Sequence, residues 1–213
     1  MHTQNYQGPF RPKKNIILAS SSPRRQRLLS DLGLNFQVVP CEHNEPLPEA
    51  NEHARGYAER LARYKSSSIN KNPTDSIVLG ADTLISFENR ILGKPVDRQD
   101  ALETLKILGG QTHQVITACF IQDPGQEQWK QFSVKTDVKM GEYPDKVLLA
   151  YIDSQEPYDK AGSYALQGAG SFLVESITGS YSNVIGLPLK ETIDALFQLD
   201  AIYSPMREEN FHN

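Results

Sequence analysis

The stretch "NIILASSSPRRQRLLSDLG", residues 15–33, joins a short apolar run to an amphipathic segment. The apolar run, residues 15–19, is typical of a buried strand. Ser22 suits the N-cap of a helix, Pro23 suits its first position, and Gly33 suits the residue that follows its last turn. A strand that feeds directly into a helix is characteristic of α/β folds.

The helix predicted over residues 23–32 begins with two cations, Arg24 and Arg25. The helix macrodipole is positive at this end, so cations there are unfavourable unless they bind an anion. The free backbone N–H groups and the hydroxyls of Ser20 to Ser22 add donors for an anion. The alternative is that both arginines lie on a solvated face or pair with nearby acids. The stretch lacks the glycines and the lysine of a P-loop, so it predicts an anion site without naming the anion.

Further strands and helices follow from hydrophobic periodicity and turn residues. The turn at "ENR" predicts a hairpin, and Asp97 and Asp100 suit the start of a helix that ends at Gly109. The remaining strands are expected over residues 35–39, 76–87, 91–95, 113–122, 128–140 and 172–177, and the remaining helices over 49–67, 144–153 and 188–199. Because strands and helices alternate with hairpins among them, we expect an α/β fold with a mixed twisted sheet and flanking helices.

Composition limits the classes of function. The formal net charge is −4, which argues against a general nucleic-acid binder. Cys41 and Cys119 match no metal or redox spacing and are expected to be free thiols in a reducing cytoplasm. No apolar run reaches the ~18 residues of a membrane span. Residues 1–14 lack the apolar core of a signal peptide and are predicted to be a disordered lead-in, with residues 203–213 as a polar tail.

Asp82 interrupts the apolar run "IVLGADTLI". An ionised carboxylate in a buried strand is costly unless it meets a cation or a metal. A turn centred on Glu88 and Asn89 places Lys94 opposite Thr83 and beside Asp82, so Lys94 is the expected partner. Two interpretations stay open: a structural ion pair, or a carboxylate that holds a divalent cation and activates water while the lysine neutralises phosphate oxygens.

Residues 42–49 form an acidic loop with Glu42, Glu45 and Glu49. Such a run is either a solvated loop or the source of a second metal ligand. Lys65 lies at the end of a predicted helix, where the dipole favours a cation regardless of function.

The long connection "EPYDKAGSYALQGAGS", residues 156–171, carries Asp159, Lys160, Tyr164 and Gln167 among glycines. Long connections in compact domains are often functional lids, although a flexible surface loop is the alternative. The amide of Gln167 offers a donor and an acceptor, which suits recognition of the edge of a base, and the tyrosines suit stacking on it.

Five segments in this order resemble the Maf family of nucleoside triphosphate pyrophosphatases, over about residues 16–200. They are "LASSSPRRQRLL", "GADTLI", "LGKPVD", "LGGQTHQVITA" and "EPYDKAGSYALQGAGSFLVESITGSYSNVIGLPL". The resemblance implies one catalytic domain over residues 15–202, with two lobes around a central cleft and a fold similar to the inosine triphosphate pyrophosphatases. It implies a hydrolase that cleaves between the α- and β-phosphates with a divalent cation, Mg²⁺ or Mn²⁺, and a homodimer.

The resemblance also implies roles for individual residues. Asp82 matches the proton acceptor, and Asp82 and Glu45 match the metal ligands. Lys65 and Lys94 match catalytic positions around the reacting phosphates. The implied substrate-binding residues are Ser20, Arg24, Arg25, Thr83, Lys160 and Gln167. Three departures from the family's pattern, His43, Asn44 and Ser66, leave the metal ligands of the acidic loop open.

Lys160 and Gln167 match the branch of the family that acts on dTTP and UTP, and with them modified pyrimidine triphosphates, as a cytoplasmic house-cleaning enzyme of nucleotide metabolism. Two alternatives remain. One is the 7-methyl-GTP pyrophosphatase branch, which usually lacks this lysine and glutamine. The other is a nucleotide-binding regulator of cell division without significant turnover, for which Asp82 and Lys94 would be unnecessary.

Overall fold

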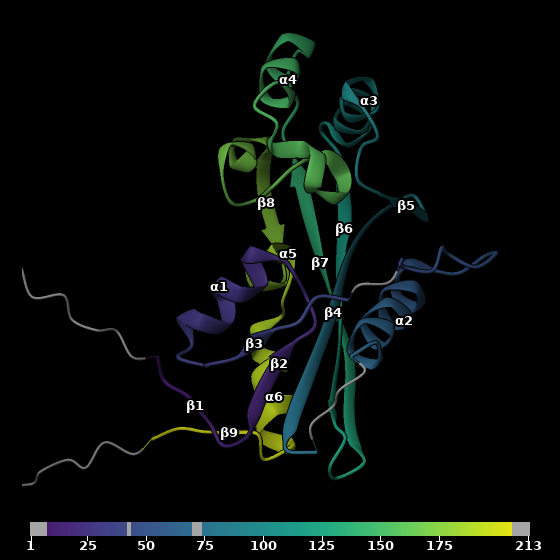
Figure 1. The fold of residues 1–213 in the computed structure, drawn as a ribbon. Coiled ribbons are helices and arrows are strands. Elements are labelled where there is room, and N and C mark those ends of the chain that lie inside the picture. Colours follow the sequence, from purple (N-terminus) through teal and green to yellow (C-terminus); the bar gives the residue numbers. More distant parts are fainter. Residues whose placement is uncertain (1–7, 42–43, 70–73, 206–213) are drawn as a thin grey trace, which may run out of the picture.

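The computed structural model describes residues 8–41, 44–69 and 74–205. One mixed sheet has the strand order β3-β2-β4-β6-β7-β8, and β5 pairs with the end of β4 (Figure 1). The strands β3, β2 and β4 are parallel, and the other pairs are antiparallel. The strands are β2 (Asn15–Leu18), β3 (Gln37–Val38), β4 (Ser76–Phe87), β5 (Arg90–Leu92), β6 (Thr112–Asp123), β7 (Gln128–Met140) and β8 (Val174–Thr178). The predicted mixed sheet is confirmed.

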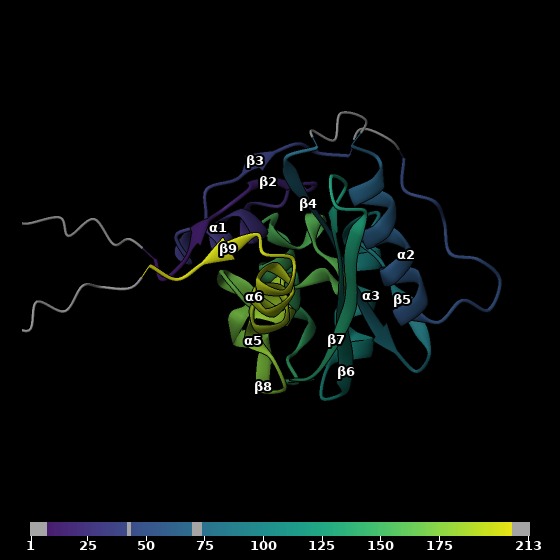
Figure 2. The same ribbon diagram turned by 90° about the horizontal axis from the view of Figure 1, so that it is seen from below.

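Helices cover both faces of this sheet. Seen from below, α2 lies on one side of β4, β6 and β7, and α5 and α6 lie on the other side (Figure 2). Three short 3₁₀ turns, η1 (Glu156–Asp159), η2 (Ala161–Ser163) and η3 (Ala169–Leu173), connect α4 to β8. The α-helices are α1 (Pro23–Asp31), α2 (Ala54–Ser67), α3 (Arg98–Leu108), α4 (Asp145–Ile152), α5 (Tyr181–Ile185) and α6 (Leu189–Gln198).

Two apolar cores lie at opposite ends of the long strands, and they define two lobes. One core packs β2, α1 and α6 against the first half of β4, with Leu18, Leu79 and Leu196 fully buried. The other core packs α3 and α4 against β6 and β7, with Leu105 and Ile152 buried. Full burial of one such side chain contributes about 1.5–3 kcal/mol to folding. The long strands β4, β6 and β7 span both lobes (Figure 1).

Several local predictions are confirmed. Strand β4 has the predicted bounds, and α1 begins at Pro23. Asp97 caps α3 by accepting a hydrogen bond from the backbone N–H of Asp100 at 2.9 Å. Glu88 and Asn89 both have positive φ, 48° and 61°, as the tight turn of a β-hairpin requires.

Other elements differ from the expectation. Strand β3 is shorter than predicted, and α2 begins at Ala54 instead of residue 49 because the chain before it runs along the helix as a loop. Helix α5 was not predicted. Cys119 is buried and Cys41 is partly buried, and the structure holds no disulfide between them. In the part of the chain that the structure describes, no helix is long and apolar enough to cross a membrane.

The expected lead-in is wrong for residues 8–14. Strand β1 (Arg11–Pro12) pairs with β9 (Ile202–Tyr203), and the backbone N–H of Lys13 donates to the carbonyl oxygen of Ala201 at 2.8 Å. Lys14 forms an ion pair with the buried carboxylate of Asp123. Residues 1–7 and 206–213, the rest of the expected lead-in and tail, lie outside the described residues, as do Glu42 and His43.

Candidate active site

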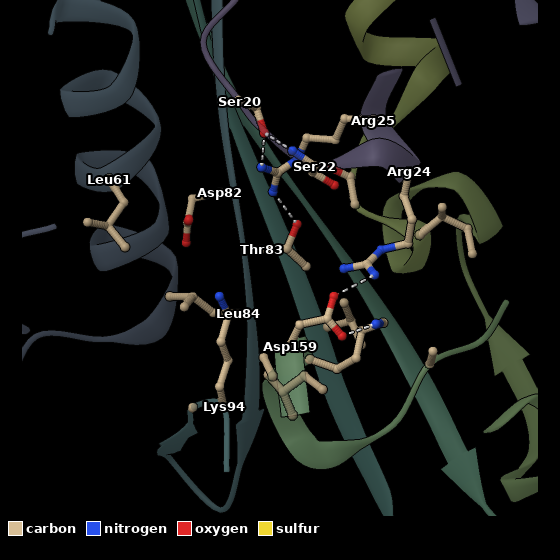
Figure 3. A pocket seen from close by; sticks show the side chains of 18 of the residues that line it. Ser20, Ser22, Arg24, Arg25, Leu61, Asp82, Thr83, Leu84, Lys94 and Asp159 are labelled. Atoms are coloured by element: carbon tan, nitrogen blue, oxygen red, sulfur yellow. Dashed lines mark hydrogen bonds and ion pairs between the residues drawn. The ribbon is translucent and has the colours of Figure 1, made fainter. Parts of the chain in front are cut away.

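A cavity of about 940 Å³ lies between the two lobes. Its walls come from α1, residues 40, 41, 45 and 48, α2, the middle of β4, the end of β5 and residues 159–167. Figure 3 shows the side chains from α1, β4 and the end of β5 that face one another across it. The structure brings all the predicted site residues together here. They are Ser20, Arg24, Arg25, Glu45, Lys65, Asp82, Thr83, Lys94, Lys160 and Gln167.

Asp82 lies at the centre of the cavity wall and is only 6% exposed. Lys65 Nζ is 2.5 Å from Asp82 Oδ1 and 2.9 Å from Glu45 Oε1, so one ammonium group bridges two carboxylates. Lys65 is in the last turn of α2, where the helix dipole also stabilises a cation. Gly80, two residues before Asp82, permits this arrangement because a Cβ there would lie 2.3 Å from the carbonyl oxygen of Ala62 in α2.

The predicted partner of Asp82 is therefore wrong. The hairpin register is as expected, with Ile85 opposite Leu92, but the pairing ends there, because β5 stops at Leu92, two residues before Lys94. Lys94 is exposed, and its side chain extends from the end of β5 into the cavity (Figure 3). It makes no ion pair with any residue that the structure describes. The packing of α2 on β4 supplies the partner instead, which a local hairpin register does not reveal.

Burial raises the pKa of Asp82 above its usual range, and the charges of Lys65 and Arg25 act in the opposite direction. Asp82 Oδ2 is buried and has no hydrogen-bond partner in the described part of the chain. A carboxylate with one free oxygen and a raised pKa is a suitable proton acceptor.

The carboxylates of the cavity also fit a divalent cation that is bound partly by the protein and partly by the substrate. Asp82 and Glu45 offer carboxylate oxygens in the same cavity, and one oxygen of Asp82 is unpartnered among the described residues. Within those residues, no group of three or more histidine, cysteine, aspartate or glutamate side chains is placed to hold a metal. Mg²⁺ is commonly held by one or two carboxylates together with substrate phosphates and water. The site therefore suits a cation that arrives with a phosphorylated substrate.

Arg25 lies behind the cavity and is 8% exposed. Its guanidinium donates to the carbonyl oxygen of Gly186 at 2.8 Å, to Ser20 Oγ at 3.0 Å and to Thr83 Oγ1 at 3.0 Å. Burial lowers its pKa, and the negative charge of Asp82 opposes this. These contacts fix the side chains of Ser20 and Thr83 at the cavity wall and place a positive charge near Asp82.

Buried hydrogen bonds continue from Thr83 into the opposite lobe. Thr83 Oγ1 is 2.9 Å from Thr117 Oγ1, which lies 2.9 Å from the carbonyl oxygen of Asn183. The amide of Asn183 donates to Val115 O and Thr136 Oγ1. Sequence reasoning missed Asn183; a polar residue among the apolar neighbours of "SNVIG" was the available signal.

Arg24 is more exposed to the cavity than Arg25. Its Nη1 lies 3.9 Å from Asp159 Oδ2, and the Lys160 ammonium pairs with the same carboxylate (Figure 3). Both cations are only partly buried, so they remain accessible to an anion in the cavity. The side chain of Ser22 makes no capping bond to α1, which leaves the backbone N–H groups of this helix end without a side-chain cap.

The connection that carries Lys160 and Gln167 is folded by its own contacts. Glu156 accepts hydrogen bonds from the backbone N–H groups of Ala169 and Gly170, both at 2.9 Å, and so closes the segment into a loop. Gly162 has φ 70°, and a Cβ there would lie 2.5 Å from Ile85 Cδ1. Gln167 is exposed at the edge of the cavity. The role of Glu156 was not predicted, and nothing in the sequence distinguished it from a surface acid.

Comparisons with known proteins identify relatives over most of the chain. The model of the Maf-like protein family matches residues 15–199. A protein named dTTP/UTP pyrophosphatase from Nitratidesulfovibrio vulgaris is 39% identical over 207 residues, covering 96% of this chain and 97% of that protein. Proteins with the same name from Geotalea uraniireducens and Bacillus cereus are 42% and 41% identical, covering 89% and 88% of this chain and 97% and 96% of theirs.

Two solved structures align with part of the chain at low sequence identity. The HAM1 protein from Coxiella burnetii aligns with a TM-score of 0.40 and 16% identity, over 62% of this chain and 75% of that one. The Ham1 protein of Staphylococcus aureus aligns with a TM-score of 0.41 and 14% identity, over 61% and 74%. The family match, in contrast, spans both lobes and every residue of the cavity that the sequence predicted. The chain belongs to the Maf-like protein family.

Proposed function

We propose that this protein hydrolyses dTTP and UTP, together with modified pyrimidine triphosphates, to the nucleoside monophosphate and pyrophosphate. Membership of the Maf family makes it a nucleotide pyrophosphatase, a hydrolase. The observation that carries the proposal is the buried Asp82 carboxylate, with one unpartnered oxygen, in a cavity rich in cations. Relatives named dTTP/UTP pyrophosphatase at about 40% identity support the choice of pyrimidine substrates.

The charge of the cavity supports a polyphosphate ligand. The side chains that line it include five cations and three carboxylates, in a chain whose formal net charge is −4. The cations are Arg24, Arg25, Lys65, Lys94 and Lys160, and the carboxylates are Glu45, Asp82 and Asp159. A local positive excess on an acidic protein concentrates anionic substrates at that place.

The reaction proceeds by attack of water on the α-phosphorus. Asp82 accepts the proton of this water as the new P–O bond forms, which is general-base catalysis. The bond between the α-phosphorus and the bridging oxygen breaks, and its electron pair leaves with pyrophosphate. Lys94 and Arg24, which extend into the cavity, neutralise charge on the leaving group.

A divalent cation, Mg²⁺ or Mn²⁺, would be held by Asp82 and Glu45 and would supply further neutralisation of the phosphate oxygens. Lys65 bridges these two carboxylates and holds them close together. It also favours the ionised form of Asp82, which is the form that accepts a proton.

Recognition of the base is assigned to residues 160–167. Lys160 provides a donor, and the exposed amide of Gln167 provides a donor and an acceptor at the cavity edge. We infer a cytoplasmic location, where the enzyme would remove unwanted nucleotides in a house-cleaning role. A homodimer remains a prediction of the family resemblance.

The proposal is tested with a panel of nucleoside triphosphates that includes dTTP, UTP, GTP and 7-methyl-GTP, each with Mg²⁺ or Mn²⁺. We expect pyrophosphate as the primary product, fastest with the pyrimidines, and incorporation of ¹⁸O from labelled water into the monophosphate. Orthophosphate as the first product would refute cleavage between the α- and β-phosphates. Faster turnover of 7-methyl-GTP, or tight nucleotide binding without turnover, would refute the assigned substrate or the assigned catalysis.

A further inference from the structure

The loop that carries Glu45 has almost no apolar anchoring. Leu47 is 82% exposed, and the side chain of Glu45 is half exposed. Nevertheless, the carboxylate of Glu45 lies 2.9 Å from Lys65 Nζ inside the cavity. Because burial of apolar side chains does not hold this loop, its polar contacts with α2 determine where Glu45 lies.

One face of α2 supplies these contacts. Three of its side chains each donate a hydrogen bond to a different backbone carbonyl oxygen of the loop. The pairs are Tyr64 Oη with Asn44 at 3.1 Å, Tyr57 Oη with Pro46 at 3.0 Å, and Arg60 Nη2 with Leu47 at 3.0 Å. Residues 57, 60 and 64 are spaced by three and four positions, so they project from the same side of the helix.

The two tyrosine contacts lie on either side of Glu45 in the sequence, at Asn44 and Pro46. The helix that provides both hydroxyls also provides Lys65, directly after Tyr64. Hence α2 holds both the ammonium group of Lys65 and the backbone on either side of Glu45, whose carboxylate that ammonium group binds.

A second set of contacts fixes the end of the same loop. Both carboxylate oxygens of Glu52 accept from Arg60, at 2.8 and 2.5 Å, and Glu52 Oε2 also accepts from the backbone N–H of Glu49. The guanidinium of Arg60 lies over the ring of Tyr57, 5.2 Å from its centroid. Glu52 and Tyr57 therefore fix the side chain of Arg60 in the position from which it contacts the carbonyl oxygen of Leu47.

We propose that Tyr57 and Tyr64 are positioning residues that hold Glu45 beside Lys65 and Asp82, so that the two carboxylates are arranged in advance for a divalent cation. This inference rests on the proposed function, because it assigns the cation to the same cavity. Side chains that orient a metal ligand typically change metal affinity about 10- to 100-fold when they are altered. Each Tyr→Phe change removes one hydroxyl and leaves the ring packing intact.

The experiment measures binding of Mn²⁺, by its electron paramagnetic resonance signal, to the protein saturated with the non-hydrolysable α,β-imido analogue of dUTP. We expect Tyr57→Phe with Tyr64→Phe to weaken Mn²⁺ binding about tenfold. Amide hydrogen exchange over residues 44–49 should become faster, and raising the Mn²⁺ concentration should recover turnover. Tyr143→Phe is the matched control, since that hydroxyl donates to the carbonyl oxygen of Phe172 at 2.7 Å, away from the cavity.

A double-mutant cycle with Glu45→Gln identifies the route of the effect. If the tyrosines act through Glu45, they add little to the loss in Mn²⁺ affinity that Glu45→Gln already causes. Fully additive losses, or unchanged Mn²⁺ affinity with faster exchange, would overturn the inference. Failure of the proposed function would appear separately, as absence of hydrolysis by the unmodified protein. If the double variant does not fold, the Tyr64→Phe single variant gives the same comparison.

Discussion

Replacement of Asp82 by asparagine separates a catalytic carboxylate from a structural one. The change preserves the size of the side chain and an oxygen that can accept from Lys65, but it removes the charge and the basicity. General-base catalysis contributes about 10²–10⁴-fold. We therefore expect folded Asp82→Asn protein to turn over UTP at least a hundredfold more slowly than the unmodified protein.

The structure also sets the expected cost in stability. Removal of one partner of a buried ion pair costs about 3–5 kcal/mol when the other charge is left alone. Lys65 is not left alone, because Glu45 Oε1 remains 2.9 Å from its Nζ. We expect a loss of about 1–2 kcal/mol, which for a domain of this size corresponds to a decrease in Tm of roughly 2–8 °C.

The assay combines thermal melting with single-turnover hydrolysis on the same preparation. Asp123→Asn is the matched control, because Asp123 is 2% exposed and ion-paired with Lys14 outside the cavity. The control should have a lower Tm, but its folded fraction should have the same single-turnover rate as the unmodified protein. A folded Asp82→Asn protein whose rate stays within about tenfold of normal would refute the role of Asp82 as the proton acceptor.

Three further predictions follow from the cavity and from the core beside it. Arg24→Ala should lower kcat/KM for UTP roughly 30- to 150-fold, because a charge-assisted contact with phosphate is lost. Arg27 is exposed on the same helix, and Arg27→Ala should change kcat/KM less than twofold. Equal losses in the two variants would contradict the anion site. Gln167→Ala should reduce the ratio of UTP to GTP turnover more than it slows UTP, and an unchanged ratio in competition assays would exclude base recognition by this amide. Burial lowers the pKa of His113 from 6.5 to about 4, so between these values the unfolded chain binds a proton that the folded chain does not, and stability falls as the pH decreases. In urea unfolding, the free energy of unfolding should be about 2 kcal/mol lower at pH 5 than at pH 7.5. This difference should disappear in His113→Gln and persist in His53→Gln, which changes a histidine at an exposed position.

The elements predicted most accurately are those whose signals are local. Strand β4 is one long apolar segment, α1 has its proline at the first helical position, and α3 has an aspartate at its N-cap. Helix α5 has five residues, which is too short for a helical period to appear. The pairing of β1 with β9 joins segments about 190 residues apart, and two-residue strands carry no pattern of their own.

The candidate site shows the same division between local and tertiary information. A carboxylate within an apolar strand identified Asp82 because burial of a charge requires a reason. The arginines of α1 were assigned together, and both line the cavity, but Arg25 is buried in hydrogen bonds with the protein whereas Arg24 is more exposed. Adjacent residues on a helix point about 100° apart, and the sequence did not show which of the two faces the opposite lobe.

The error over the partner of Asp82 has a specific physical cause. Side chains on a strand alternate between faces, so Gly80 and Asp82 project toward the same side of β4, the side on which α2 packs. A Cβ at position 80 would lie 2.3 Å from Ala62 O and 2.6 Å from Ser66 N, so only glycine allows the backbone of α2 to approach this closely. That approach brings the last turn of α2, and with it Lys65, to Asp82. A glycine inside a strand is a known mark of close backbone approach, and "LGAD" contained it. The ion pair at the centre of the cavity therefore depends on a residue that has no side chain at all.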